Sequence, residues 1–442
     1  MSEIVKYILG ISPSILLPII IIIMSLFMKM KLKDALMSGI TLAIAFTSIS
    51  LVIGFMFNTI SPVAQRFVEY TSIKLDIIDV GFSPMVTISF AWKFMIIMFP
   101  LQIILNILMI HFNFTNVLNV DIFNIWTKVF TAAIVSVVSK SIIFGFIASI
   151  IQILLELKIS EKIRPRVEQM TGIVATTITH VSIIQCLIMY TINNLLDKVS
   201  FIRNTKLDIG YLKNRIGVFG EDSVMGFLIG MILSIFSGYS LIESLEISVK
   251  LASALVLLPI IANMFVKALN PVSEVAKNFM KSKYKDRDIV IGLEWTILGS
   301  IAELWIVSVL LIPITLILAL LFSKLGFSSI LPLAGIINPM IVVPALIISN
   351  RNLLKMLILG IIITPIYLMV STNIAPAITE LSKNINIIEN EGQLISYYAF
   401  ESPYFRWSLI KLFEFKIYGI ISFITLVLLF IYFYNNFGNK KI

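Results

Sequence analysis

The sequence repeats itself at a spacing of about 210 residues, and this internal duplication constrains the fold more than any other feature. The matches keep their register at Pro, Gly and acidic positions, which coincide by chance far less often than Leu or Ile in an apolar chain. They pair 32, 34 and 36 with 241, 243 and 245, Pro62-Val63 with Pro271-Val272, Gly81 with Gly292, and the Ser-x-x-Ile-x-Pro of 160–165 with that of 371–376. Many membrane transporters consist of two related halves that move around a site between them. The duplication therefore indicates a transporter.

The composition places the chain in a membrane. Of its 442 residues 58% are hydrophobic and only 13% are charged. Apolar runs at 11–28, 35–57, 306–322 and 417–434 have spanning or near-spanning length, and in lipid such runs must close their backbone hydrogen bonds as helices. We read the first run as a retained helix. One cysteine, Cys186, excludes an internal disulfide, and two histidines argue against a metal cluster.

The distribution of basic residues predicts that the two halves are inverted relative to each other. Lys29, Lys31 and Lys33 follow the first helix, whereas the matching positions 238, 240 and 242 are uncharged. Conversely, the stretch 267–287 is rich in lysine, whereas its counterpart carries only Arg66 and Lys74. Basic loops remain on the cytoplasmic side, so related loops of opposite bias lie on opposite sides of the membrane. The net charge of +9 is explained in this way without nucleic acid.

These signals predict an all-α polytopic membrane protein with about eleven transmembrane helices, two inverted repeats and an external N-terminus. One integrated domain, 1–442, contains the repeats at 11–197 and 220–410 and a final helix at 415–434 that returns the C-terminus to the cytoplasm. The helices are expected near 11–28, 35–57, 85–111, 118–139, 141–157, 222–239, 242–266, 295–322, 328–349, 353–370 and 415–434.

Two further segments are expected to be re-entrant hairpins. Both flanks of 171–197 are basic, so this stretch enters the membrane and returns, with its polar tip at 176–180. Residues 371–414 hold the matching hairpin on the outer side. Irregular backbone is tolerated at this depth where it lines a cavity.

The strongest candidate site residues are Glu294 and His180. Glu294 lies between Gly292 and Trp295, and an acid beside a Trp suits a polyhydroxyl ligand, because the carboxylate accepts hydroxyl hydrogen bonds while the ring packs on C–H faces. The alternative for this pair is an ordinary position at the membrane interface. His180 lies at the tip of the first hairpin, where ligand contact and a structural role are both open.

Other polar residues in apolar surroundings are also candidates, because polar groups are costly inside a membrane. Asn119 and Asp121 lie at the entry of the helix expected at 118–139, which Asp121 could instead cap. Asn338 precedes Pro339 at a helix break, and Asp79 lies near Ser83, the repeat mate of Glu294. Glu401 falls where the tip of the second hairpin is expected, with an exposed outer loop as the alternative. Lys93 and Glu303 could form a buried pair, with a structural role favoured.

Four segments taken together resemble a known family: 118–126, 215–221, 270–274 and 291–294. They are similar to the galactitol-specific IIC permease component of the bacterial phosphoenolpyruvate-dependent sugar phosphotransferase system, which belongs with the ascorbate permeases. The resemblance extends over nearly the whole chain. It implies a homodimer of eleven-span protomers, in which the first two helices of each repeat form a V-shaped dimer-side domain and the rest moves like an elevator.

The resemblance also implies the chemistry and the partners. A cytoplasmic IIB protein carrying phosphocysteine, supplied by IIA, would phosphorylate a sugar alcohol that this chain binds and translocates, with His180 and Glu294 in contact with it. The chain departs from the family pattern at Glu294, where Asp is expected, at Ser300, where His is expected, and at Gly335, where an acidic residue is expected. The resemblance therefore implies galactitol or a related polyol as the ligand.

Two transport mechanisms fit the sequence. The first is group translocation in the bacterial inner membrane, with no enzymatic activity, cofactor or bound metal in this chain. It needs a partner, because the chain has neither a nucleotide-binding P-loop nor a cysteine in a phosphate-cradling loop. The second is ion-coupled secondary transport of a small polar solute, for which an inverted repeat and buried charges would look the same.

The inverted topology predicts that the basic stretch 267–287 faces the cytoplasm, where it contributes to IIB docking. A Lys281→Cys variant should react with a membrane-impermeant thiol reagent only from the cytoplasmic side. Labelling from outside in intact cells would show that the orientation is the opposite one and that the distribution of basic residues was misinterpreted.

Overall fold

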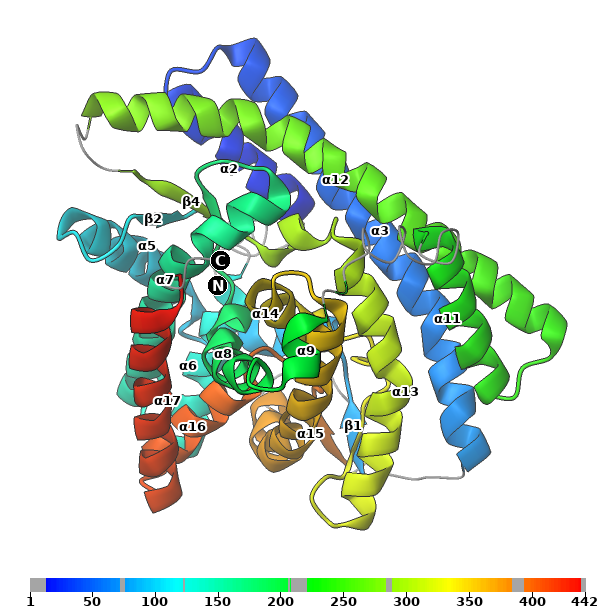
Figure 1. Cartoon of the computed structure of the whole chain (residues 1–442). Coiled ribbons are helices and arrows are strands. Elements are labelled where there is room, and N and C mark those ends of the chain that lie inside the picture. The colour runs from blue at the N-terminus through cyan, green and yellow to red at the C-terminus, as the bar shows by residue number, and fades with distance from the viewer. Residues whose placement is uncertain are drawn as a thin grey trace.

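The computed structural model describes residues 13–71, 76–121, 124–205, 207, 221–283, 288–383 and 393–438. The described part is mostly helical and consists of a layer of four helices on one side of a larger helical body (Figure 1). Part of the family-like segment 118–126 and nearly all of 215–221 lie outside the described residues, as do 284–287 of the lysine-rich stretch.

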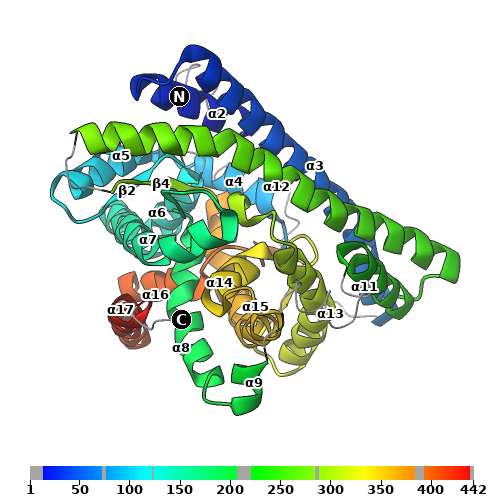
Figure 2. The same ribbon diagram turned by 45° about the horizontal axis from the view of Figure 1, so that its top comes forward.

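The four-helix layer contains α2 (Pro13–Phe27), α3 (Leu32–Thr71), α11 (Asp222–Phe236) and α12 (Leu241–Lys283). Figures 1 and 2 both show α3 and α12 side by side along one edge of the molecule, with Phe46 of α3 packed edge-on against Phe265 of α12 at 4.9 Å between ring centroids. Both helices run well past their predicted ends. Residues 267–283, predicted as a loop, are therefore helical, and so is the segment after residue 57 up to Thr71.

The body is built around two enclosed helices, α6 (Ile125–Ser139) and α14 (Pro339–Ser349). Every residue of α14 is buried, as is α6 from Ile125 to Ser136. Around them lie α4 (Phe82–Phe90), α5 (Met95–His111), α7 (Ile142–Thr171), α8 (Cys186–Leu196), α9 (Ser200–Asn204), α13 (Ala302–Lys324), α15 (Leu353–Lys383), α16 (Pro403–Phe413) and α17 (Ile417–Asn436). Two 3₁₀ turns, Val181–Gln185 and Trp295–Leu298, precede α8 and α13.

Several predicted helices prove to be different elements. The helix expected at 85–111 is broken into α4 and α5, which meet at a bend of 86°. The helices expected at 118–139 and 328–349 each begin with a strand and a loop, and become helical only at Ile125 and Pro339. The reason in the first case is local. Asn119 and Asp121 accept hydrogen bonds from main-chain N–H groups two and three residues ahead, which competes with helix formation.

Within the ranges that the structure describes, six short strands form two parallel three-stranded sheets, which the apolar pattern did not predict. The strands are β1 (Ile77–Asp79), β2 (Val117–Asn119), β3 (Thr176–Ile178), β4 (Val290–Leu293), β5 (Ile330–Leu331) and β6 (Leu394–Ser396). One sheet has the order β5-β1-β6 and the other β2-β4-β3. Each central strand thus comes from a different part of the sequence than its two neighbours, with Asp79 opposite Ser396 and Gly292 opposite both Asn119 and Thr177.

The helices confirm a polytopic membrane protein in its general form. In the part of the chain that the structure describes, five helices are long and apolar enough to span a membrane, or six if the bent α4–α5 pair is one span. Large apolar side chains such as Ile143 of α7, which is 70% exposed, face outward as lipid-facing side chains do. The full count of eleven spans stays a prediction.

Candidate substrate site

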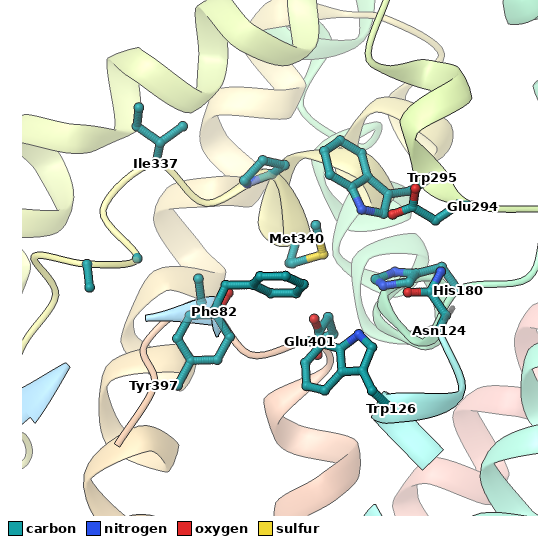
Figure 3. Close-up of a pocket in the computed structure, with 14 residues that line it drawn as sticks. Phe82, Asn124, Trp126, His180, Glu294, Trp295, Ile337, Met340, Tyr397 and Glu401 are labelled. Atoms are coloured by element: carbon teal, nitrogen blue, oxygen red, sulfur yellow. The ribbon is translucent and has the colours of Figure 1, made fainter. Parts of the chain in front are cut away.

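A cavity of about 240 Å³ lies where the two sheets, α6 and α14 converge. Figure 3 shows its lining, in which aromatic and acidic side chains face a shared space. The lining residues are Phe82, Asn124, Trp126, His180, Glu294, Trp295, Ala334, Gly335, Ile337, Pro339, Met340, Tyr397, Ala399 and Glu401. Three of the seven predicted site residues, His180, Glu294 and Glu401, are therefore brought together although they are far apart in the sequence.

The two predicted tip segments meet at this cavity. Ser402 has a left-handed backbone conformation, with φ of +48°, at the start of α16. Its hydroxyl donates a hydrogen bond of 2.7 Å to the carbonyl of Val181. This bond joins the segment after β6 to the segment after β3, and so places Glu401 and His180 on walls of the same cavity.

Glu294 is positioned by the central strand β4. It follows Leu293 directly and begins the 3₁₀ turn Trp295–Leu298. The hydroxyl of Thr296 donates to Glu294 Oε2 at 2.7 Å, which fixes one carboxylate oxygen. The pairing of the acid with Trp295 that the sequence indicated is preserved, since both line the cavity.

The hydrogen bonds of His180 assign its tautomer. The main-chain N–H of Ser182 donates to His180 Nδ1 at 3.3 Å, and the Ser182 hydroxyl lies 2.7 Å from the same atom. A main-chain N–H can only donate, so Nδ1 is the acceptor and the hydrogen of the neutral ring resides on Nε2. The imidazole thus has an N–H available as a donor on a cavity wall, where Figure 3 shows it beside Asn124.

Asn119 and Asp121 do not line the cavity but position a residue that does. Asn119 Oδ1 accepts from the hydroxyl of Thr179 and from the main-chain N–H of Asp121, both at 2.9 Å. Asp121 in turn accepts from the main chain and side chain of Asn124. Asp121 therefore holds Asn124, the residue that precedes α6, and does not cap the helix itself.

Asp79 and Asn338 also bind main chain in place of facing the cavity. Asp79 Oδ2 accepts from the N–H of Gly335 at 2.7 Å, and Oδ1 accepts from that of Tyr398 at 3.1 Å. One carboxylate therefore ties together two stretches of cavity wall. Asn338 Oδ1 accepts from the N–H of Met340 at 3.0 Å and caps α14.

Gly335, where the family resemblance leads us to expect an acidic residue, has no room for one. A Cβ atom at this position would lie 2.8 Å from Cβ of Ala399 and 2.9 Å from its nitrogen. The close approach of these two main-chain stretches explains why glycine is found here, and it leaves Glu294 and Glu401 as the two carboxylates on the cavity wall.

The aromatic walls were only partly foreseen. Trp126 packs edge-on against Phe82, with ring centroids 5.4 Å apart, and Tyr397 completes this side of the cavity. Only Trp295 stood out in the sequence, because of the acid beside it. Trp126 and Phe82 lie in apolar stretches where an aromatic residue has no distinguishing pattern, and Tyr397 follows a strand that was not predicted.

A buried cluster of four charges lies next to the cavity and was missed by the sequence analysis. Lys128 Nζ of α6 lies 2.7 Å from Glu156 Oε2 of α7, with both side chains no more than 1% exposed. Arg406 Nη2 of α16 lies 3.3 Å from Glu401 Oε2, and its guanidinium stacks over Phe130 at 4.9 Å. Each basic side chain of the cluster thus has an acidic partner, and paired charges can remain buried. Through Arg406 it holds one of the two cavity carboxylates.

The proposed pair of Lys93 and Glu303 is not formed. Glu303 is fully buried and accepts from Arg351, with Nη2 at 2.8 and 3.0 Å from its two oxygens. Lys93 lies in the bend between α4 and α5, over the ring of Phe94 at 4.8 Å. The structural role expected for Glu303 is retained with a different partner. Over the ranges that the structure describes, no group of three or more His, Cys, Asp or Glu side chains is placed to hold a metal ion.

Removal of Lys128 should destabilise the protein severely. Lys128→Met leaves the Glu156 carboxylate uncompensated, and breaking a buried ion pair in this way costs about 3–5 kcal/mol. The double variant Lys128→Met/Glu156→Gln should recover much of that loss, because no charge is stranded. Lys250→Met is the control, since Lys250 and Glu246 form an exposed 3.9 Å pair. Thermal unfolding of the purified proteins measures the effect, and a shift for Lys128→Met no larger than the control would show that the pair carries no stability.

Comparison with known proteins gives the family. Residues 7–392 match the family model described as the sugar-specific permease component of the phosphotransferase system. The chain is 28% identical over 415 residues to the galactitol-specific EIIC component of Escherichia coli strain K12, which covers 93% of this chain and 91% of that protein. It is 27% identical over 424 residues to a putative permease IIC component of the same strain, covering 95% and 96%. The chain therefore belongs to the EIIC-GAT family of phosphotransferase-system permease components.

Proposed function

We propose that this permease component binds galactitol or a related sugar alcohol in the cavity and moves it across the bacterial inner membrane for phosphorylation by a cytoplasmic IIB protein. The observation that carries the proposal is the meeting of His180, Glu294 and Glu401, from three distant segments, around one cavity. The similarity to the galactitol-specific component of E. coli supports the choice of ligand class.

The lining matches the chemistry of a polyol. A sugar alcohol carries a hydroxyl on every carbon, so it offers many donors and acceptors and no charge. Glu294 and Glu401 supply carboxylate oxygens that accept strong hydrogen bonds from hydroxyls. The His180 Nε2–H supplies a donor, and Trp295 supplies an aromatic face for the C–H groups. A small number of polar groups in a largely apolar lining is typical of small-molecule sites, where these groups fix the orientation of the ligand.

The phosphoryl group must come from a partner. Cys186 is fully buried, so it cannot receive a phosphoryl group from a soluble protein. The family resemblance assigns that step to phosphocysteine on IIB, which IIA recharges, and leaves this chain as a non-enzymatic transport subunit. The helical stretch 267–283 at the end of α12 is our proposed contribution to IIB docking, on the cytoplasmic side.

The architecture we propose is an inverted repeat of residues 11–197 and 220–410 with a final helix at 415–434, eleven spans in all, and an external N-terminus. The two sheets support this arrangement. In one, β1 of the first half lies between two strands of the second half, and in the other, β4 of the second half lies between two strands of the first half. The four-helix layer would form the contact of a homodimer. It touches the body mainly through α13, which leaves the body able to slide past it in an elevator-like step.

Transport in membrane vesicles distinguishes this proposal from ion-coupled transport, an alternative with which the buried charge cluster is equally compatible. Vesicles containing the permease and phosphorylated IIB should accumulate labelled polyol as its phosphate after all ion gradients have been collapsed. Vesicles without phosphorylated IIB should not. Uptake that follows an ion gradient and ignores IIB would refute group translocation.

Glu294→Gln should weaken polyol binding, because an amide oxygen accepts hydrogen bonds less strongly than a carboxylate. The loss of one charge-assisted hydrogen bond corresponds to about 1.5–3 kcal/mol, or roughly tenfold to a hundredfold in the dissociation constant. Binding of labelled galactitol to purified protein measures it. Glu246→Gln, at an exposed position on α12, is the control and should bind as the unmodified protein does. Unchanged binding by folded Glu294→Gln would remove Glu294 from the site.

A further inference from the structure

Trp126 has a buried hydrogen-bond donor without a partner at the proposed binding cavity. The side chain is 1% exposed and lies in the first turn of α6. Its indole Nε1 is buried and, among the residues that the structure describes, has no hydrogen-bond partner. Tryptophan N–H groups in protein interiors normally find an acceptor, because a buried donor without one costs free energy. An orphaned donor at a cavity wall therefore points to an acceptor that comes from outside the protein.

Other tryptophans show that the chain satisfies this group where no ligand is expected. Trp305 is fully buried, and its Nε1 donates to the carbonyl of Gly299 at 2.5 Å. Trp407 donates to Asn373 Oδ1 at 3.0 Å. Trp126 differs from both because its ring lines the cavity, packed edge-on against Phe82, and Figure 3 shows the nitrogen-bearing edge of the ring on the side of Glu401 and His180.

The other polar groups of the cavity explain why such a donor is useful there. Glu294 and Glu401 contribute carboxyl oxygens, which accept from a hydroxyl without regard to where its lone pairs point, and His180 contributes another donor. A donor forms a hydrogen bond to the oxygen of a hydroxyl, and that hydroxyl can in turn donate a hydrogen bond to a carboxylate. Hydrogen bonds arranged in such a chain strengthen one another. A donor on the Trp126 wall, across from an acceptor, thus fixes the orientation of one hydroxyl.

We propose that Trp126 is a specificity-determining residue whose indole N–H donates a hydrogen bond to one hydroxyl oxygen of the bound sugar alcohol. The inference rests on the proposed function, since it requires a polyol in this cavity. It adds a contact that neither the sequence pattern nor the family resemblance assigns, and it predicts that the protein distinguishes polyols by the presence of one particular hydroxyl.

The first experiment is a cycle of protein and ligand variants, read as binding of galactitol and each of its mono-deoxy derivatives to purified protein. Trp126→Phe keeps a ring but removes the N–H, and should weaken galactitol binding roughly twofold to tenfold, the range of one neutral hydrogen bond. For one mono-deoxy derivative, the same substitution should leave the dissociation constant unchanged, because that ligand lacks the accepting oxygen. Trp295→Phe is the matched control and should weaken all of these ligands by a similar factor.

The second experiment uses the unmodified protein and does not depend on the Trp126 variant folding. The chain has five tryptophans, so indole ¹⁵N–¹H spectra contain five side-chain signals. Phe substitutions at the other four assign their signals, and the remaining signal belongs to Trp126. It should move downfield when galactitol is added, as expected for a newly bonded N–H, and should not move with the one derivative that lacks the accepting hydroxyl.

The outcomes separate the inference from the function on which it rests. If galactitol binds but no derivative is selectively insensitive to Trp126→Phe, or the Trp126 signal stays in place, the inference is overturned and the polyol site remains. If the unmodified protein binds no neutral polyol, the proposed function fails, and the inference fails with it.

Discussion

The structure depends on the rule that main-chain polar groups inside a membrane must bind one another. A helix satisfies this rule by itself, whereas the extended segments that build the cavity cannot. They satisfy it by pairing with segments from elsewhere in the chain, as β1 does with β5 and β6, and β4 with β2 and β3. The six strands are therefore what permits irregular backbone beside the cavity, and their ends deliver Glu294, Asn119 and Thr179 to the same region.

Side chains extend this pairing to the loops that follow the strands. The Asp79 carboxylate holds the N–H groups of Gly335 and Tyr398, and the Ser402 hydroxyl holds the carbonyl of Val181. The Asp79 carboxylate and the Ser402 hydroxyl do not line the cavity themselves, but they fix the positions of residues that do. The charge cluster acts similarly, because Arg406 restrains Glu401 from behind. Positioning and contact are thus performed by different residues, and a loss of binding in a variant must be interpreted with that division in mind.

Three polar residues singled out in the sequence line one cavity, whereas much of the secondary structure around it was not predicted. His180, Glu294 and Glu401 were recognised because polar residues at a tip or beside a tryptophan are conspicuous in an apolar chain. Asp79, Asn119, Asp121 and Asn338 were recognised for the same reason, but their bonds to main chain depend on loops whose positions no pattern encodes. Lys128 and Glu156 were missed because two charges on different helices become a pair only when α6 packs on α7. Strands of two to four residues are too short to show the alternation by which a strand is recognised.

The pairing of strands from distant parts of the chain also determines when, during synthesis, the sheets can form. During synthesis β1 emerges early, but its partners β5 and β6 emerge only near the end, and the bond between Tyr398 and Asp79 spans 319 residues. Until then β1 has no strand to pair with, although the helices before it are already able to insert. Contacts over such separations form slowly. The first sheet therefore stays incomplete until the C-terminal segment arrives, and a chain released before β6 lacks the Tyr397, Ala399 and Glu401 walls of the cavity.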